Sequence, residues 1–242
     1  MDTVIALAGN PNVGKSTVFN SLTGLNQHTG NWPGKTVENA RGRYGFEGRS
    51  YILVDIPGTY SLMANSPEET IARDFICFGG SGAVIVVADA TCLERNLNLV
   101  LQILEITGNA VLCVNLLDEA EKKKIRIDLP ALSALLGIPV IGACARKGLG
   151  LAELKSAVSN IALSEAPRKP RKMEYGTAVE KAVSILEPAV KSALSGRAES
   201  RWVTLKLLDG EESILSSLNR YLSLDILKNE AIAAKLSEAK EI

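Results

Sequence analysis

Long apolar runs, paired cysteines and an excess of charge of one sign are all missing from this 242-residue chain. No apolar stretch reaches the roughly 18 to 20 residues that a membrane-spanning helix needs, and the N-terminus lacks a charged-then-apolar signal segment. These absences predict a soluble chain. Because 27 Lys and Arg residues balance 27 Asp and Glu residues, no basic surface for nucleic acid or anionic lipid is expected.

Residues that commonly bind metals or form disulfides are scarce. The four cysteines, Cys77, Cys92, Cys113 and Cys144, include no CxxC pair, and two lie in or beside predicted buried strands, where cysteine acts as a small apolar residue. This pattern favours free thiols in a reducing compartment. His28 is the only histidine and is more typical of a solvated loop residue than of an iron ligand.

Glycine, by contrast, is placed where phosphate chemistry needs it. Residues 9–16 read Gly-Asn-Pro-Asn-Val-Gly-Lys-Ser, a complete GxxxxGKS loop between the apolar run 3–8 and the helix-compatible run 17–22. The backbone N–H groups of such a loop bind a polyphosphate, the lysine adds charge and the serine can ligate magnesium. The sequence therefore predicts a nucleoside triphosphate site formed by Gly9, Asn10, Pro11, Asn12, Val13, Gly14, Lys15, Ser16 and Thr17.

A second motif predicts which base is bound. Asn115-Leu-Leu-Asp118 follows the apolar run 110–114 and matches the NxxD part of the guanine-recognition motif, with leucine in place of its usual lysine. An aspartate can accept hydrogen bonds from guanine N1–H and the 2-amino group, neither of which adenine offers. Taken alone, Asn-x-x-Asp at a strand end is also typical of a helix N-cap or a turn.

Three further elements stand in the order that a GTPase requires. Asp55-Ile-Pro-Gly58 ends the apolar run 50–54, so the aspartate can hold magnesium through water while the glycine N–H approaches a γ-phosphate. Thr36, close after Gly34, is placed to complete the magnesium shell. Cys144-Ala145-Arg146 follows the run 138–141 and takes the place of the Ser-Ala-Lys loop that contacts guanine O6. Together the five motifs predict a GTPase.

The remaining pattern predicts an α/β fold with a second, helical part. Residues 25–39 and 59–69 are expected to be mobile loops, a hairpin is expected over 41–46 and 50–55, and a helix over 71–78. Strands at 83–88, 110–114 and 140–143 alternate with helices at 93–107, 129–136 and 151–163, which is typical of a Ras-like, mostly parallel sheet. The nucleotide should lie at the carboxyl ends of its strands.

The domain boundaries follow from a break in this alternation. Two prolines and four basic residues between 164 and 172 bury nothing and predict a linker. The expected parts are a GTP-binding domain over 1–165, a linker over 166–172 and a helical regulatory domain over 173–242. Helical patterns in the last part are amphipathic, and we expect them to pack on the first domain or on a partner because they cannot cover themselves well.

Longer stretches resemble the FeoB family of bacterial and archaeal ferrous-iron transport proteins. The resemblance is carried by Gly30-Asn-Trp-Pro-Gly-Lys-Thr-Val-Glu38, Asp55-Ile-Pro-Gly-Thr-Tyr-Ser-Leu62 and Trp202-Val-Thr-Leu-Lys-Leu-Leu-Asp-Gly210, so it extends over the whole chain. It implies a GTPase at the cytoplasmic face of the inner membrane, attached to a polytopic permease that this chain lacks. Small cytosolic iron-transport accessory proteins and a second copy of the chain are further expected partners, and nucleic acid is not.

The resemblance also implies roles for single residues. Ser16 and Thr36, with Asp55, would hold Mg²⁺, while Asn12 would bind K⁺ together with carbonyl groups around Gly30 and Trp32. Such a cation could stabilise charge that an arginine finger otherwise stabilises; the alternative for Asn12 is a cap of its loop.

The implied catalytic set is Lys15, Asn12, Thr36, Gly58 and Thr59. Thr59 stands where many small GTPases carry a water-orienting glutamine, so hydrolysis should be slow. Cys144 replaces the usual serine, which could speed nucleotide release.

Two other classes compete with this interpretation. A ribosome- or RNA-associated GTPase can use a similar potassium-type phosphate loop, but it should carry a basic appendage, whereas residues 173–242 mix both signs of charge. A GTPase without activity would require loss of a phosphate- or magnesium-binding residue, and none is lost.

Overall fold

The computed structural model describes residues 2–24, 27–32, 38–164 and 170–242. The chain divides into two compact units, Met1–Arg171 and Lys172–Ile242. Among the described residues, no helix is long and apolar enough to cross a membrane.

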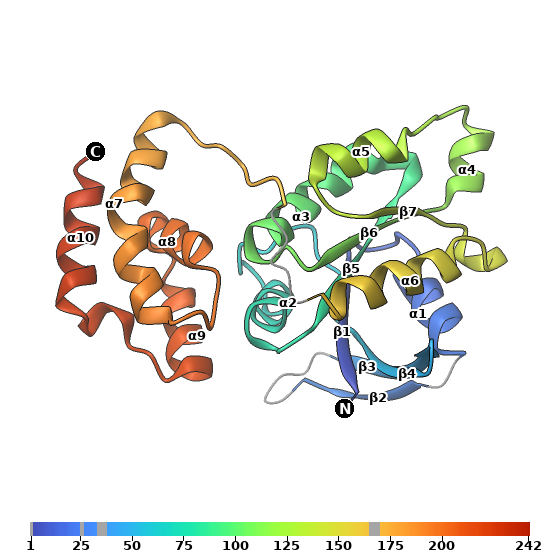
Figure 1. The fold of residues 1–242 in the computed structure, drawn as a ribbon, viewed down its shortest axis with the longest axis horizontal. Helices are drawn as coiled ribbons and strands as arrows, with labels where there is room; N and C mark the ends of the chain where they lie inside the picture. Colours follow the sequence, from blue (N-terminus) through green and yellow to red (C-terminus); the bar gives the residue numbers. More distant parts are fainter. Residues whose placement is uncertain (1, 25–26, 33–37, 165–169) are drawn as a thin grey trace. The chain divides into compact units, whose positions relative to one another are not determined.

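The first unit is built on a seven-stranded sheet with the order β2-β3-β4-β1-β5-β6-β7 (Figure 1). Strands β4, β1, β5, β6 and β7 run parallel, while β2 and β3 are joined to this set by antiparallel pairing. The strands are β1 (Thr3–Gly9), β2 (Gln27–Asn31), β3 (Glu38–Phe46), β4 (Arg49–Asp55), β5 (Ala83–Asp89), β6 (Ala110–Asn115) and β7 (Val140–Gly142). The prediction of a mostly parallel sheet is confirmed.

The central strands form because their sequences are apolar almost without interruption. All six residues of β6 and all of β5 except Asp89 are buried, as expected for parallel strands that are covered on both faces. On one face, Val18 and Phe19 of α1 (Lys15–Thr23) and Leu154 of α6 (Leu151–Ala162) join Ile5 and Leu7 of β1 in the main apolar cluster. Helix α3 (Leu93–Ile106) contacts β5 and β6, so helices cover the sheet whose strands lead into the loops of the site.

Helix ends in the first unit follow local signals in the sequence. Ser66 caps α2 by accepting the N–H of Glu69, with Pro67 in the first turn, so the predicted start at residue 71 is too late. Asp128 caps α5 in the same way through Ala131. The helices are α1 (Lys15–Thr23), α2 (Pro67–Phe78), α3 (Leu93–Ile106), α4 (Leu117–Lys122), α5 (Leu129–Leu136) and α6 (Leu151–Ala162).

Two stretches that the sequence predicts as loops are regular structure. Residues 27–31 form β2, which pairs with β3 from Gln27↔Gly42 to Asn31↔Glu38, so the prediction of a loop over 25–39 is wrong for these residues. Backbone pairing needs no apolar side chains at a sheet edge, and the polar composition therefore concealed the strand. The charged run 121–124, whose composition by itself is typical of a solvated loop, begins inside helix α4, which includes Glu121 and Lys122.

The predicted linker is attached to the first unit at its end. Pro170 is buried, and the backbone N–H of Arg171 donates to the carbonyl oxygen of Leu136 at the end of α5, at 3.1 Å. The expectation that the segment buries nothing is therefore wrong for these residues, because a proline ring contributes apolar surface despite its basic neighbours. Residues 166–169 lie outside the described part of the chain.

The second unit consists of helices with a core of their own. Its elements are α7 (Thr177–Leu194), α8 (Ser200–Asp209), α9 (Glu212–Leu222), the short 3-10 helix η3 (Ile226–Lys228) and α10 (Glu230–Lys240). Helix α7 contacts α8 and α10, and α8 contacts α9. Leu186, Val203, Ile214, Leu218 and Ile232 are fully buried. The helices of the second unit thus share a core of their own, so the expectation that they cannot cover themselves well is wrong for these residues, while packing on the first domain or on a partner stays a prediction.

An ion pair joins α7 and α8, the first two helices of this unit. The guanidinium of Arg201 on α8 donates to both carboxylate oxygens of Glu180 on α7, at 2.9 and 2.8 Å. These hydrogen bonds, with that from the Tyr175 N–H, lower the pKa of Glu180 from 4.5 to about 2. Because the pKa is lowered in the folded state, the stabilisation is complete above about pH 4.5 and is lost as the pH falls toward 2.

We expect Glu180→Gln to lower the free energy of unfolding of the second unit by up to about 1 kcal/mol at pH 7, since the pair is partly solvated. The difference from the parent should shrink to nothing as the pH falls from 4.5 toward 2. Trp202 fluorescence in a Trp32→Phe background reports this unit alone, because the chain has two tryptophans. Glu238→Gln, which removes an exposed i,i+3 pair with Lys235, is the control; an equal effect there would contradict the prediction.

Candidate nucleotide-binding site

The phosphate loop connects β1 to α1 at the carboxyl edge of the sheet. Gly9 ends β1, and α1 begins at Lys15. Gly14 and Asn12 both have left-handed backbones, with φ of 82° and 65°. A β-carbon at Gly14 would come within 2.5 Å of the Asn115 Nδ2 atom. Glycine is therefore required at position 14 by both conformation and space.

Lys15 lies beside the aspartate of the DxxG motif. Its ammonium group forms an ion pair with the carboxylate of Asp55 and donates to the Ile56 carbonyl oxygen at 2.9 Å. Burial raises the pKa of Asp55, against the opposing effect of the Lys15 charge. Two residues predicted to act on phosphate and magnesium are thus brought together, although they are 40 positions apart.

The DxxG segment is fixed to the first strand and its loop. The Ile56 N–H donates to the Leu7 carbonyl oxygen at 3.1 Å, and the Thr59 N–H to that of Gly9 at 3.3 Å. A β-carbon on Gly58 would lie at ordinary contact distance, 3.5 Å, from the Pro11 nitrogen. Packing alone does not require glycine here, so any requirement would come from a ligand that approaches its N–H.

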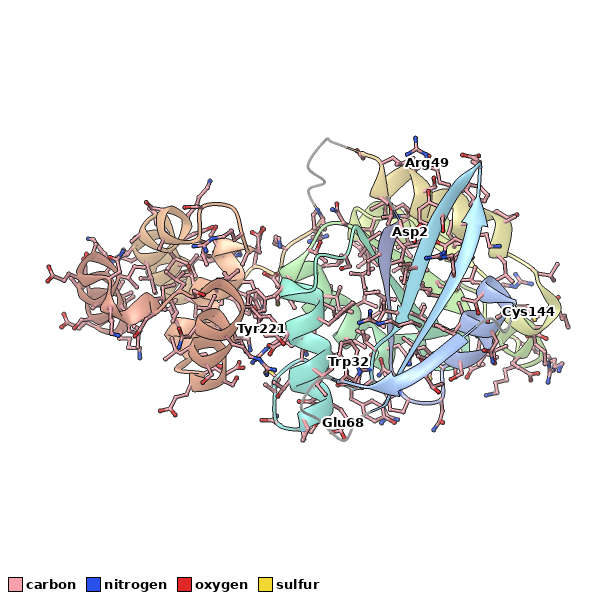
Figure 2. The ribbon with its side chains drawn as sticks, turned by 90° about the horizontal axis from the view of Figure 1, so that it is seen from below. Asp2, Trp32, Arg49, Glu68, Cys144 and Tyr221 are labelled. Carbon is pink, nitrogen blue, oxygen red and sulfur yellow. The ribbon has the colours of Figure 1, made fainter. Side chains whose placement is uncertain are left out.

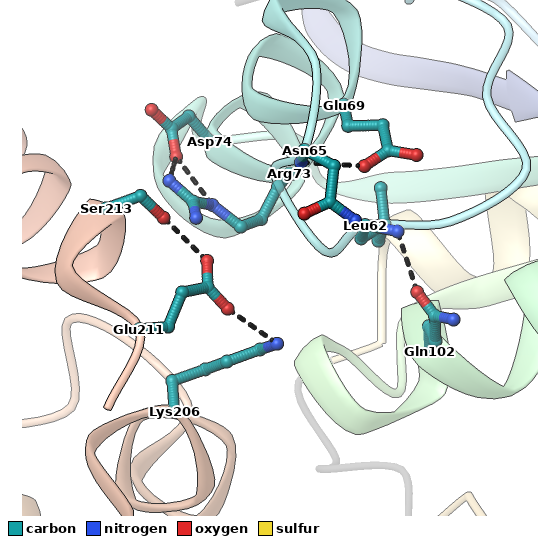
Figure 3. Close-up of polar contacts among 9 residues, drawn as sticks. All are labelled: Leu62, Asn65, Glu69, Arg73, Asp74, Gln102, Lys206, Glu211 and Ser213. Atoms are coloured by element: carbon teal, nitrogen blue, oxygen red, sulfur yellow. Dashed lines mark hydrogen bonds and ion pairs between the residues drawn. The ribbon is translucent and has the colours of Figure 1, made fainter. Parts of the chain in front are cut away.

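The segment after Gly58 is held on helix α3. The Thr59 hydroxyl donates to the Ser61 carbonyl oxygen and accepts the Ser61 N–H, so it closes a local turn. Gln102 of α3 accepts the Leu62 N–H at 2.7 Å, as Figure 3 shows. The Arg95 guanidinium lies 4.5 Å from the centre of the Tyr60 ring, a cation–π distance.

Asn115 joins the phosphate loop to the loop predicted to contact guanine. Its Nδ2 donates to the Val13 carbonyl oxygen, and its Oδ1 accepts the Ala145 N–H, both at 3.1 Å. The side chain is 1% exposed, so these bonds are made away from water, where leaving either partner unsatisfied is costly. The alternative of a simple helix cap does not describe this residue.

Asp118 lies in the first turn of α4, near the 144–147 loop. Lys147 pairs with its carboxylate at 2.9 Å. The hydrogen bond from Lys147, followed by that from the Cys144 thiol, lowers the pKa of Asp118 to about 2. The carboxylate is therefore ionised, and a pure acceptor, throughout the neutral range.

Burial and the Asp118 carboxylate raise the pKa of Cys144. Its sulfur therefore stays a neutral thiol that can donate to Asp118.

The potassium ligands that the resemblance implies are not gathered in the same way. Asp55 pairs with Ala40, and Ala40 with Thr29, so Gly30 reaches the same edge of the sheet but two strands from Asp55. Trp32 packs edge-on against Phe75 of α2, with ring centres 5.2 Å apart, and Figure 2 shows it beside that helix. Gly34 and Thr36 lie outside the described residues. A potassium site therefore stays a prediction.

The site offers the atoms that a nucleotide and its magnesium ion need. Ser16 and Thr17 are exposed at the start of α1, where helix N–H groups attract anions. The hydroxyl of Ser16 and the carboxylate of Asp55 are oxygen ligands of the kind magnesium prefers. Asn10 is 3% exposed, and its Oδ1 has no hydrogen-bond partner among the described residues. The donor set fits a magnesium-bound polyphosphate.

Comparison with known proteins agrees with this geometry. The family model described as ferrous iron transport protein B matches residues 3–158, and the model of the FeoB cytosolic helical domain matches residues 175–242. The chain belongs to the FeoB family.

Two solved FeoB structures and one curated relative show the extent of the likeness. The cytosolic domain of T. maritima FeoB in a GDP form has a TM-score of 0.82 at 36% identity, covering 100% of this chain and 96% of that one. Its GMPPNP form has a TM-score of 0.80 at 37% identity, covering 99% and 96%. The Fe(2+) transporter FeoB of Escherichia coli K12 is 40% identical over 211 residues, 86% of this chain and 27% of the relative. The chain therefore spans about a quarter of that FeoB protein.

Sequence reasoning missed part of this FeoB site. Lys147, which pairs with Asp118, directly follows the three residues assigned to the guanine loop, so its position beside a recognition motif was the available signal. Leu116 has φ of 64°, a left-handed backbone that turns the chain between Asn115 and Asp118. A leucine gives no indication of such a turn, because this conformation usually belongs to glycine or asparagine.

Gly14→Ala should weaken guanine nucleotide binding about ten-fold or more, because the left-handed backbone is strained by a β-carbon and that carbon displaces Asn115. Fluorescence titration with ribose-labelled GDP measures the change. Gly48→Ala is a matched control, since Gly48 has φ of 73° but no atom lies within 4 Å of the point that a β-carbon would occupy there. It should bind GDP like the parent while being similarly strained, and an equal loss of affinity in both variants would disprove the role of crowding at Asn115.

Proposed function

We propose that this chain binds GTP with Mg²⁺ and hydrolyses it to GDP and phosphate, as the cytosolic part of a ferrous-iron transporter. The observation that carries the proposal is the Asn115 side chain, which joins the phosphate loop to the guanine loop beside an ionised Asp118. Family membership and the nucleotide-bound T. maritima forms support it.

Guanine selectivity would rest on Asp118. Its carboxylate would accept hydrogen bonds from guanine N1–H and the 2-amino group, whereas adenine would leave it without donors. Because the pKa of Asp118 is lowered to about 2, protonation of this group would not weaken GDP binding anywhere above about pH 4. Asn115 would keep the Ala145 loop close to the position of guanine O6.

The phosphate groups would be bound by the backbone N–H groups of residues 10–16 and by Lys15. Ser16 and Asp55, together with Thr36, would hold Mg²⁺, which when bound would neutralise charge on the phosphate oxygens. Since Lys15 already pairs with Asp55, both groups are preset at the edge where the phosphates would lie. Gly58 would offer its N–H to the terminal phosphate.

Hydrolysis is expected to be slow without further help. The Thr59 hydroxyl is hydrogen-bonded to the backbone of Ser61, so it is already engaged away from a water nucleophile. The exposed Asn12, held in a left-handed conformation, would bind K⁺ beside the phosphates and so add positive charge to that of Lys15.

The relatives named as Fe(2+) transporters support a place at the cytoplasmic face of the cell membrane. In this proposal, nucleotide hydrolysis in the first unit regulates iron uptake through a permease region of the same longer protein. The helical second unit, matched by the cytosolic helical domain model, would modulate nucleotide binding. Accessory cytosolic proteins and self-association remain proposed partners; the balanced charge gives no support to an RNA-associated role.

GTP turnover should be at least several-fold faster in potassium than in sodium at equal ionic strength, and Asn12→Ala should abolish the difference. Phosphate release over time measures both rates. Asn109→Ala, at an exposed asparagine just before β6 and outside the phosphate loop, is the control and should keep the parent response to potassium. Equal parent rates in the two salts would remove Asn12 from the catalytic set, while absence of any GTP turnover in either salt would contradict the GTPase proposal itself.

Cys144→Ser should slow GDP dissociation by about two- to five-fold, because a hydroxyl donates a stronger hydrogen bond to Asp118 than a thiol does. Release of ribose-labelled GDP into excess unlabelled GDP gives the rate. Cys92→Ser, at an exposed cysteine outside the loop, should leave it unchanged. An unaltered rate in Cys144→Ser would count against an effect of this cysteine on release.

A further inference from the structure

Helix α1 makes a long-range contact with the guanine loop through one side chain. The Ser21 hydroxyl donates to the Ala145 carbonyl oxygen at 3.1 Å, across 124 positions of sequence. Thr23, on the same helix, instead donates to the Phe19 carbonyl oxygen within α1, at 2.8 Å. The two hydroxyl groups thus have different roles: one satisfies its own helix, and the other reaches a separate loop.

The peptide groups of Ala145 are held from both sides. The Ala145 N–H donates to Asn115, while its carbonyl oxygen accepts from Ser21 and from the Gly148 N–H, the latter also at 3.1 Å. The loop closes on itself where Cys144 pairs with Leu149. Ser21 is therefore the member of this set that connects the loop to the helix carrying Lys15.

The position of Ser21 along α1 allows this helix to contact two loops of the site. Lys15 starts the helix at the phosphate end, and a rise of 1.5 Å per residue places Ser21 about 9 Å further along. One rigid helix thereby contacts the phosphate loop at its first residue and the guanine loop near its end. A displacement of the loop that breaks the Ser21 bond would leave Ala145 held by the hydrogen bond to Asn115 and by its packing in the main apolar cluster.

We infer that Ser21 is a positioning residue for guanine recognition, holding the 144–147 loop against α1 and so slowing release of the nucleotide. The inference rests on the proposed function, because it assigns a role within that same site. Ser21 is solvent-exposed, so its hydrogen bond competes with water, and its loss should change the dissociation rate by a few-fold rather than by orders of magnitude.

The test compares Ser21→Ala, Ser21→Thr and Thr23→Val in the full chain. Ser21→Ala should speed dissociation of ribose-labelled GDP about five-fold, which is typical of one net hydrogen bond. Ser21→Thr keeps the hydroxyl on an exposed site and should restore the parent rate. Thr23→Val removes a hydroxyl from the same helix without touching the loop, and its dissociation rate should match the parent even if its melting temperature falls.

A second nucleotide separates positioning from a general effect on the fold. In ribose-labelled 6-thio-GDP, sulfur replaces O6 and accepts hydrogen bonds weakly, while the donors for Asp118 remain. If Ser21 acts by placing the loop against O6, Ser21→Ala should speed release of this analogue less than two-fold. A purely structural role would accelerate both nucleotides alike.

The possible outcomes bear on two separate claims, the role of Ser21 and the binding of GDP. An unchanged GDP dissociation rate in Ser21→Ala, equal acceleration of both nucleotides, or failure of Ser21→Thr to restore the rate would overturn the role of Ser21 and leave GDP binding standing. Failure of the parent chain to bind labelled GDP at micromolar concentration would instead overturn the proposed function on which this role depends.

Discussion

A single buried amide, the side chain of Asn115, connects the parts of this site. It donates to Val13 in the phosphate loop and accepts from Ala145 in the guanine loop, so the two loops cannot move apart without leaving a buried polar group unsatisfied. Asn115 itself ends strand β6, whose six residues are all buried. Asn115 therefore ties both loops to the central sheet.

Charge is arranged around this amide in two separate pairs. Lys15 with Asp55 lies beside the proposed phosphate position, and Lys147 with Asp118 beside the loop proposed to contact guanine. Burial raises the pKa of Asp55, whereas hydrogen bonds lower that of Asp118. The same residue type therefore meets opposite environments, and the more easily ionised carboxylate is the one suited to accept hydrogen bonds from a base.

The sequence predicted the features that depend on local chemistry. The unbroken apolar run at 83–88 predicted a strand, and the structure has β5 there; Gly14 has the left-handed backbone that favours glycine, while its role at a phosphate stays a prediction. Strand β2 was missed because its pairing comes from β3 rather than from its own side chains. Lys147 and Ser21 were missed for a related reason: their partners are distant in sequence, and a lysine or serine on a polar surface looks the same with or without a partner.

The bond from the Arg171 N–H to Leu136 has a mechanical consequence. The chain that enters the second unit at Lys172, called the tether here, is hydrogen-bonded one residue earlier to the end of α5. Tension along this tether would therefore be received by Leu136, which is separated from Cys144 by one turn and the short strand β7. A pull on the tether would therefore act on the segment that leads through β7 into the guanine loop.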